Sequence, residues 1–189
     1  YKIKDINFTI NYKDLNECNV YIITVPTPVN KLNKPDLRFI KQACKDIGSI
    51  LNINDVVIFE STVYPGLTEE FCVPIIEKHS KLIFNKEFFC GYSPERINPS
   101  DKIHKLTKII KITSGSNKKT LTFVDNLYKS IIKAGTYKVK SIKIAEAAKV
   151  IENSQRDLNI AFVNELAQIF DKLEINTKDV LNAASTKWN

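Results

Sequence analysis

The chain has 189 residues, of which 43% are hydrophobic and 26% charged, and its formal net charge at pH 7 is +7. This length suits one ordinary domain and part of another, and the composition is that of a soluble globular protein. No apolar run approaches the roughly 20 residues that a membrane-spanning helix needs, and the sequence contains no signal-peptide pattern. We therefore expect a cytoplasmic protein without a membrane partner.

The positive charge does not by itself indicate nucleic-acid binding. The lysines are spread along the chain, with no block of like charges and no basic stripe interleaved with aromatics. We expect no nucleic-acid partner and a mild attraction for anionic small molecules such as pyrophosphates. The cysteines Cys18, Cys44, Cys72 and Cys90 form no C-x-x-C pair and the two histidines stand alone, so we predict no metal site and expect reduced, buried thiols.

The first elements along the chain are predicted as strand, helix and strand. The runs 19–25 and 55–59 are apolar at successive positions, which is typical of strands that are covered on both faces of a parallel sheet. Between them, the apolar residues of 36–51 recur at helical spacing, and Asp36 is placed to cap the start of this helix.

The alternation then continues. We predict a helix at 68–79, strands at 88–92 and 108–112, a helix at 118–133 and a short extended piece at 137–139. Strand–helix repetition at these lengths predicts a doubly wound, Rossmann-like α/β fold with a parallel sheet and right-handed crossovers. We assign residues 1–141 to this domain. It lacks the Gly-rich turn that normally opens a dinucleotide-binding sheet, so we expect the chain to begin partway into the sheet.

A different pattern follows, and we assign residues 142–189 to the beginning of a second, helical domain. From 142 to about 173 there is no Pro or Gly, and a helix of this length would run about 48 Å. It should link two domains or pack against a partner subunit, because it is too long for a crossover. Its apolar stripe consists of Ile151, Leu158, Phe162, Leu166, Ile169 and Leu173. After a shorter helix at 177–184 the sequence stops abruptly, which suggests an internal piece of a longer protein.

Polar loops follow three consecutive predicted strands, at 25–28, 60–66 and 91–99. They carry hydroxyl groups, prolines that rigidify the loop and, in the last one, an acid beside a base. Such residues are common in any loop. However, ligands of open α/β sheets bind at the carboxyl ends of the strands, so three such exits in succession favour a functional site.

The long helix carries a second candidate group. Lys149, Asn153 and Arg156 are spaced i, i+4 and i+7, which places them within an arc of about 60°. Three polar donors would then point the same way, towards a ligand. The alternative is a solvated helix face with an ordinary pair between Glu152 and Arg156, and the spacing alone favours this alternative.

Four segments in register resemble the UDP-glucose/GDP-mannose dehydrogenase family. They are Val-Pro-Thr-Pro at 25–28, Glu-Ser-Thr-Val-Tyr-Pro-Gly at 60–66, Gly-Tyr-Ser-Pro-Glu-Arg-Ile-Asn-Pro at 91–99 and Ala-Glu-Ala-Ala-Lys-Val-Ile-Glu-Asn at 145–153. The resemblance covers essentially the whole chain and is strongest to the branch that acts on UDP-N-acetylglucosamine or UDP-N-acetylgalactosamine. It implies an NAD-dependent, four-electron oxidation of the C6 alcohol of a UDP-N-acetylhexosamine for surface polysaccharide synthesis, through a cysteine-bound thiohemiacetal and thioester.

The resemblance also implies roles for individual residues. The residues implied in NAD binding are Thr27, Ser61, Thr62 and Glu95. In catalysis, Thr62 would hold the attacking water and Glu95 would be the general base for thioester hydrolysis. Lys149 and Asn153 would stabilise the negative oxygen that forms at C6. The residues implied in substrate binding are Arg96, Ile97, Lys149, Asn153 and Arg156.

Further expectations concern parts outside these motifs. The long helix would form a homodimer, and the nucleophilic cysteine would lie in a Gly-Gly-His-Cys segment beyond Asn189, so that the 189 residues alone would be inactive. Glu174 occupies a position where the family usually has Gly; if it is a left-handed cap, it costs on the order of 1 kcal/mol. The competing hypothesis is a non-catalytic, helix-mediated assembly module that retains only the fold.

Overall fold

The computed structural model describes residues 6–98, 101, 103 and 105–188. The chain divides into two compact units, Tyr1–Val150 and Ile151–Asn189, which are described separately below. The division falls inside the long helix, whereas the predicted domain boundary precedes it. Ile142, Ala145 and Glu146 in the first turns of this helix are buried and belong to the first unit.

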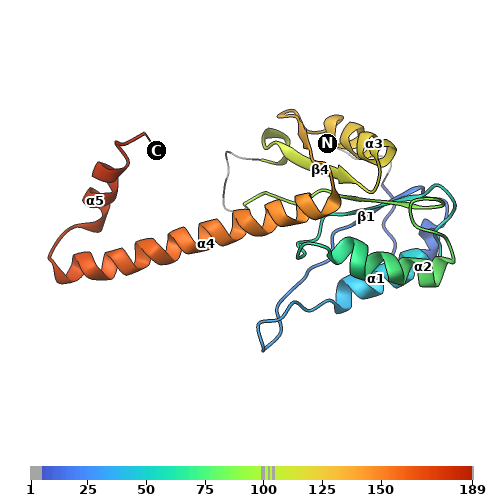
Figure 1. The fold of residues 1–189 in the computed structure, drawn as a ribbon, viewed down its shortest axis with the longest axis horizontal. Helices are drawn as coiled ribbons and strands as arrows, with labels where there is room; N and C mark the ends of the chain where they lie inside the picture. Colours follow the sequence, from blue (N-terminus) through green and yellow to red (C-terminus); the bar gives the residue numbers. More distant parts are fainter. Residues whose placement is uncertain (1–5, 99–100, 102, 104, 189) are drawn as a thin grey trace. The chain divides into compact units, whose positions relative to one another are not determined.

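The first unit is a five-stranded sheet in the order β1-β2-β3-β4-β5. The strands are β1 (Val20–Ile23), β2 (Val56–Phe59), β3 (Phe89–Tyr92), β4 (Lys111–Gly115) and β5 (Thr136–Lys138). The helices are α1 (Arg38–Gly48), α2 (Val73–Ser80), α3 (Lys118–Lys129) and the start of α4 (Ile142–Lys172), with a π-helical turn at Thr68–Cys72 and 3-10 turns at Tyr12–Leu15 and Leu106–Lys108. The α/β fold class is as predicted (Figure 1).

The sheet is mixed rather than wholly parallel. β1, β2 and β3 are parallel, β4 is antiparallel to β3, and β5 is parallel to β4. The predicted strand at 108–112 is displaced towards the C-terminus, because 106–108 form a 3-10 turn. A parallel strand needs a crossover, usually a helix, and no helix longer than that turn lies among the described residues between β3 and β4. The chain therefore re-enters the sheet at the edge where β3 ends, and β4 runs antiparallel to β3.

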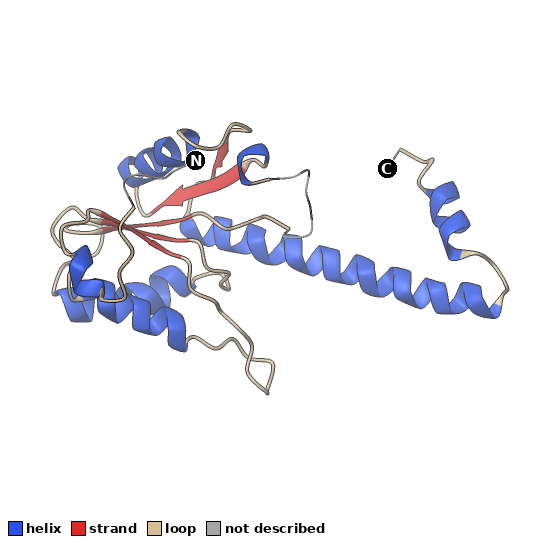
Figure 2. Cartoon of the chain, turned by 180° about the vertical axis from the view of Figure 1, so that it is seen from behind, coloured by secondary structure: helices blue, strands red, loops and turns tan. Residues whose placement is uncertain are grey.

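The reversal of β4 places helices on both faces of the sheet. A right-handed crossover that connects two strands running in one direction puts its helix on one face of the sheet. A right-handed crossover that connects two strands running in the opposite direction puts its helix on the other face. α1 and α2 cover one face, where Val57 and Phe59 of β2 are buried, and α3 covers the other, where Val56 and Ile58 pack on it (Figures 1 and 2). The successive apolar residues of β2 thus serve two separate cores, as expected for a strand covered on both faces.

The helix ends show two differences from the sequence-based expectations and one agreement. Asp36 is not the N-cap of α1; the cap position is Leu37, and the Asp36 carboxylate instead accepts the Arg38 amide and pairs with the Arg38 guanidinium. α1 and α3 are also shorter than predicted. In the second unit, α5 (Thr177–Ala184) has the predicted bounds.

Glu174 is a left-handed cap, since its φ is +56°, so the condition set by the sequence-based expectation is met. The amide of Ile175 donates to the carbonyl of Phe170 (2.9 Å) and that of Glu174 to Asp171 (3.2 Å), which closes the end of α4 as a Schellman motif. Gly would adopt this conformation without the steric cost that Glu carries.

Asp125 is the main polar residue that joins α3 to β4 and β5. Its buried carboxylate accepts hydrogen bonds from the hydroxyls of Thr113 in β4 (3.0 Å) and Thr136 in β5 (2.5 Å). Lys129 pairs with it at 2.8 Å. Burial raises the pKa of the Asp125 carboxyl, but the hydrogen bonds from Lys129, Thr136 and Thr113 outweigh burial and hold the pKa below its usual value.

We predict that Asp125→Asn lowers the free energy of unfolding at pH 7 by about 2 kcal/mol, because it removes charge-assisted hydrogen bonds. A lowered folded-state pKa means that the stabilisation is complete above the unfolded pKa of about 4 and is lost as pH falls through the folded pKa. Urea unfolding at pH 7, 4 and 3 should therefore show the two proteins converging in stability. Asp46→Asn is the control and should change less, because the Asp46 carboxylate accepts one exposed side-chain bond, from Gln42, and asparagine keeps an oxygen for it. A difference in unfolding free energy between the wild type and Asp125→Asn that does not change with pH would contradict the lowered pKa of Asp125.

Candidate functional site

The loops that leave β1 and β2 are joined by hydroxyl groups. The Thr27 hydroxyl donates to the carbonyl of Thr62 (2.6 Å), and the Ser61 hydroxyl donates to the carbonyl of Val25 (2.7 Å). Ser61 is buried and its hydroxyl is used within the fold, whereas the Thr62 side chain is exposed. The structure thus brings the three hydroxyl residues implied in cofactor binding to one edge of the sheet.

This edge meets the chemical requirements of a dinucleotide. Cofactors of doubly wound sheets lie across the carboxyl ends of the parallel strands, and β1 and β2 are parallel. The loop segments 25–28 and 60–66 carry hydroxyls, and their one acidic side chain, Glu60, is paired with Lys111. The residues present therefore fit the NAD predicted from the sequence.

The loop that leaves β3 is anchored to the same edge. The Tyr92 hydroxyl donates to the carbonyl of Ser61 (3.2 Å), and the Ser93 amide donates to the carbonyl of Phe59 (2.9 Å). The Ser93 hydroxyl donates to the carbonyl of Ile112 in β4 (2.7 Å). The third exit loop is therefore held between β2 and β4 before it reaches Glu95.

Glu95 closes this loop upon itself. One carboxylate oxygen accepts the amides of both Arg96 (2.6 Å) and Ile97 (2.8 Å). The Arg96 guanidinium donates to the carbonyl of Ile110 (2.7 Å), so it braces the loop against the entry to β4. Ile97 is exposed. The three residues implied at this exit therefore lie together on one compact turn.

The first turns of α4 grip two exit loops. The Lys149 ammonium donates to the main-chain carbonyl of Glu95 at 2.5 Å. One turn earlier, the fully buried carboxylate of Glu146 accepts the amides of Gly66 (2.6 Å) and Thr68 (3.0 Å) in the loop that follows β2. Lys149 thus lies beside Glu95, and both are candidate residues from the sequence. The group that Lys149 binds is the main-chain carbonyl of Glu95, which the sequence alone did not indicate.

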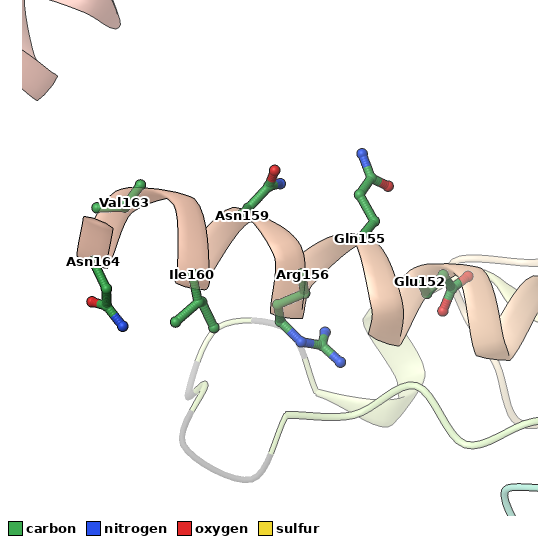
Figure 3. Close-up of a pocket in the computed structure, with 7 residues that line it drawn as sticks. All are labelled: Glu152, Gln155, Arg156, Asn159, Ile160, Val163 and Asn164. Carbon is green, nitrogen blue, oxygen red and sulfur yellow. The ribbon is translucent and has the colours of Figure 1, made fainter. Parts of the chain in front are cut away.

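Asn153 and Arg156, the other two candidate residues of α4, belong to the second unit. The Arg156 guanidinium donates to the side-chain oxygen of Asn153 at 2.6 Å. A shallow hollow along α4 is lined by Glu152, Gln155, Arg156, Asn159, Ile160, Val163 and Asn164. In Figure 3, Gln155 and Asn159 leave the helix on one side, while Arg156 and Asn164 leave it on the other. This hollow is therefore not an enclosed site.

A buried polar cluster that the sequence did not indicate lies beneath the third exit loop. The Lys111 side chain, 5% exposed, lies 3.4 Å from a carboxylate oxygen of Glu60 and 4.8 Å from the ring centre of Tyr128. The Tyr128 hydroxyl donates to Glu60, and burial together with this carboxylate raises the pKa of Tyr128. A lysine within the isoleucine-rich segment 108–112 was the available signal, because buried charges in strands are normally paired.

None of the four cysteines suits a nucleophile at this edge. Cys44, Cys72 and Cys90 are buried, and burial holds the pKa of Cys90 well above its usual value. Contact with Cys44 and burial raise the pKa of Cys72 in the same way. Cys18 is exposed, contrary to the expectation of a buried thiol, and it precedes β1, at the end opposite to the exit loops.

We predict that Glu146→Gln lowers the free energy of unfolding by about 2 kcal/mol, because an amide offers only one oxygen to two buried N–H donors. Urea unfolding measures the loss. Glu70→Gln is the matched control, since its pair with Lys143 is solvent-exposed and such pairs contribute about 0–1 kcal/mol. Equal effects of the two substitutions would show that the buried carboxylate does not hold the loop.

Comparison with known proteins gives consistent matches along the chain. Residues 2–132 match the UDP-glucose/GDP-mannose dehydrogenase family, NAD binding domain, and residues 143–189 match the central domain of the same family. The UDP-N-acetyl-D-glucosamine 6-dehydrogenase of Pseudomonas aeruginosa is 58% identical over 98% of this chain and 44% of its own length. Protein CapL of Staphylococcus aureus is 53% identical over 100% of this chain and 44% of its own length. The chain thus spans less than half of these relatives.

Solved structures agree with the fold. The UDP-D-ManNAc dehydrogenase of Pyrococcus horikoshii has a TM-score of 0.89 and 30% identity, covering 96% of this chain and 43% of that protein. The GDP-mannose dehydrogenase of Pseudomonas aeruginosa, at 24% identity and a TM-score of 0.86 over 95% of this chain and 42% of its own, supports the fold alone. Since the family matches together cover nearly the whole sequence, the chain belongs to the UDP-glucose/GDP-mannose dehydrogenase family.

Proposed function

We propose that the complete protein containing this chain is an NAD-dependent 6-dehydrogenase that oxidises the C6 alcohol of a UDP-N-acetylhexosamine to the acid. The contact between the Lys149 ammonium and the Glu95 loop carries this proposal, because it places a cation at the edge where three exit loops meet. The relative from Pseudomonas aeruginosa, named UDP-N-acetyl-D-glucosamine 6-dehydrogenase, supports the choice of substrate. The product would serve as a precursor of surface polysaccharides in the cytoplasm.

The proposed chemistry uses donors that are fixed before the reaction begins. Bound NAD supplies the hydride acceptor. Lys149, with Asn153, stabilises the negative charge that develops on the C6 oxygen. Glu95 acts as the general base when water releases the product, and Thr62, exposed at the second exit, positions that water. We assign cofactor contacts to Thr27, Ser61, Thr62 and Glu95, and substrate contacts to Arg96, Ile97, Lys149, Asn153 and Arg156.

We place the nucleophilic thiol outside these 189 residues, in a Gly-Gly-His-Cys segment. The burial of three cysteines here and the position of Cys18 at the opposite end of the sheet support this placement, because a nucleophilic cysteine needs access and a lowered pKa. On this proposal the 189 residues alone do not turn over substrate.

The complete protein should form two NADH per sugar from UDP-N-acetylglucosamine or UDP-N-acetylgalactosamine. The absorbance of NADH measures this yield. Lys149→Ala should lower kcat by about 100-fold or more with a much smaller change in KM, because a preorganised donor acts mainly in the transition state. Lys143→Ala is the control on the same helix, since its ammonium pairs with the exposed Glu70. An unchanged kcat for Lys149→Ala would remove the oxyanion role.

We also propose that two copies of the protein form a homodimer through α4. The exposed apolar stripe supports this, with side chains such as Ile151, Leu158 and Phe162 each more than 60% exposed. The competing hypothesis, a non-catalytic assembly module, would use the same stripe. A dimer that forms no NADH with either sugar nucleotide would support the module.

Light scattering should give a dimer mass for the complete protein and a monomer mass for Leu158→Glu/Phe162→Glu, because two buried charges would oppose the apolar interface. Asn164→Glu lies on the opposite side of the helix and should leave the mass unchanged. A dimer that survives the double substitution would exclude this stripe as the interface.

A further inference from the structure

The Lys111–Glu60–Tyr128 cluster lies directly under the loop that carries Glu95. Glu60 follows β2, Lys111 begins β4, and Tyr128 comes from α3. Because β4 runs antiparallel to β3, its first residue lies at the edge where β3 ends. A parallel β4 would have placed Lys111 at the far edge. The reversal of the sheet therefore delivers a buried cation to the exit loop.

Lys111 binds the main chain of this loop. Its ammonium donates to the carbonyls of Ser93 and Pro94, at 3.3 Å each. The next carbonyl along the chain, that of Glu95, accepts the Lys149 ammonium. Three successive carbonyl groups are therefore each turned towards a lysine, two from below the loop and one from α4.

The orientation of these carbonyls determines where the Glu95 side chain starts. A peptide group is planar, so fixing the Pro94 carbonyl fixes the plane that ends at the Glu95 amide. Fixing the Glu95 carbonyl then fixes the following plane, whose Arg96 amide holds the Glu95 carboxylate. The two lysines thus define both peptide planes on either side of Glu95.

Stability alone is a weak reason for this arrangement. A buried ion pair contributes little net stability, because desolvation offsets the attraction, and an apolar pair of similar volume often does as well. A methionine at position 111 would fill the space but could not bind two carbonyls. The feature that only a cation provides here is the fixed direction of the loop.

We propose that Lys111, held by Glu60, is a positioning residue that sets the conformation of the 93–97 loop and thereby the placement of Glu95. The role rests on the proposed function, in which Glu95 is the general base. Lys111 itself touches neither the substrate nor the cofactor in this proposal; it acts through the loop.

The test compares four variants of the complete protein: Lys111→Met, Lys111→Arg, Glu60→Gln and Thr113→Val. Thr113→Val is the matched control, because it weakens the same strand by removing a buried hydrogen bond to Asp125 but keeps both bonds from Lys111 to the loop. The measurements are kcat and KM, the melting temperature, and hydrogen–deuterium exchange of the peptide 93–98 by mass spectrometry.

For Lys111→Met we expect kcat to fall by about tenfold or more, since small misplacements of a catalytic group have large effects, with KM values within about threefold of wild type. Exchange in 93–98 should accelerate. Lys111→Arg should restore most of both properties because it keeps the charge. Thr113→Val should leave both near wild type at a comparable loss of melting temperature.

The proposal is overturned if Lys111→Met and Thr113→Val behave alike at equal melting temperature, or if Lys111→Arg is no better than Lys111→Met. If Lys111→Met does not fold, Glu60→Gln decides, because glutamine keeps an oxygen for Tyr128 while removing the charge that holds Lys111; unchanged exchange and kcat would then refute the role. If the wild type forms no NADH, the proposed function fails, while the exchange data still test the loop.

Discussion

The structure of the candidate site depends on the grip of the first turns of α4 on two exit loops. Glu146 presents a buried carboxylate to the amides after β2, and Lys149 presents an ammonium to the carbonyl of Glu95 after β3. One helix thereby fixes two loops by contacts of opposite charge, each matched to the main-chain group that it meets. Since charged groups buried without partners are costly, these contacts also fix where α4 begins relative to the sheet.

The reversal of β4 has a second consequence for the same site. It moves α3 to the face opposite α1 and α2, and it brings Lys111 and the carbonyl of Ile110 to the edge where β3 ends. The loop with Glu95 is consequently hydrogen-bonded to β2, β4 and α4. The connection between β3 and β4, whose described residues form no helix longer than a 3-10 turn, therefore assembles the polar surroundings of Glu95.

The chemistry of the edge is divided among its loops. The exits of β1 and β2 offer hydroxyls, and their one acidic side chain, Glu60, is paired with Lys111, which suits a ligand that carries phosphates; the exit of β3 offers an acid held beside a lysine. The thiols of this chain lie in the core or at the far end of the sheet. An acid, a cation and hydroxyl groups are thus present together, as the proposed reaction requires.

The sequence by itself determined the order of strands and helices, the long helix and the motif residues at three strand exits, because these follow from apolar periodicity and local residue patterns. It did not determine the direction of β4, since an apolar segment has the same pattern in either direction. Nor did it indicate Lys111 and Glu146 as partners of the exit loops. Each binds main-chain groups at least 17 residues away in sequence, and only the packing of the sheet against α3 and α4 brings such groups together.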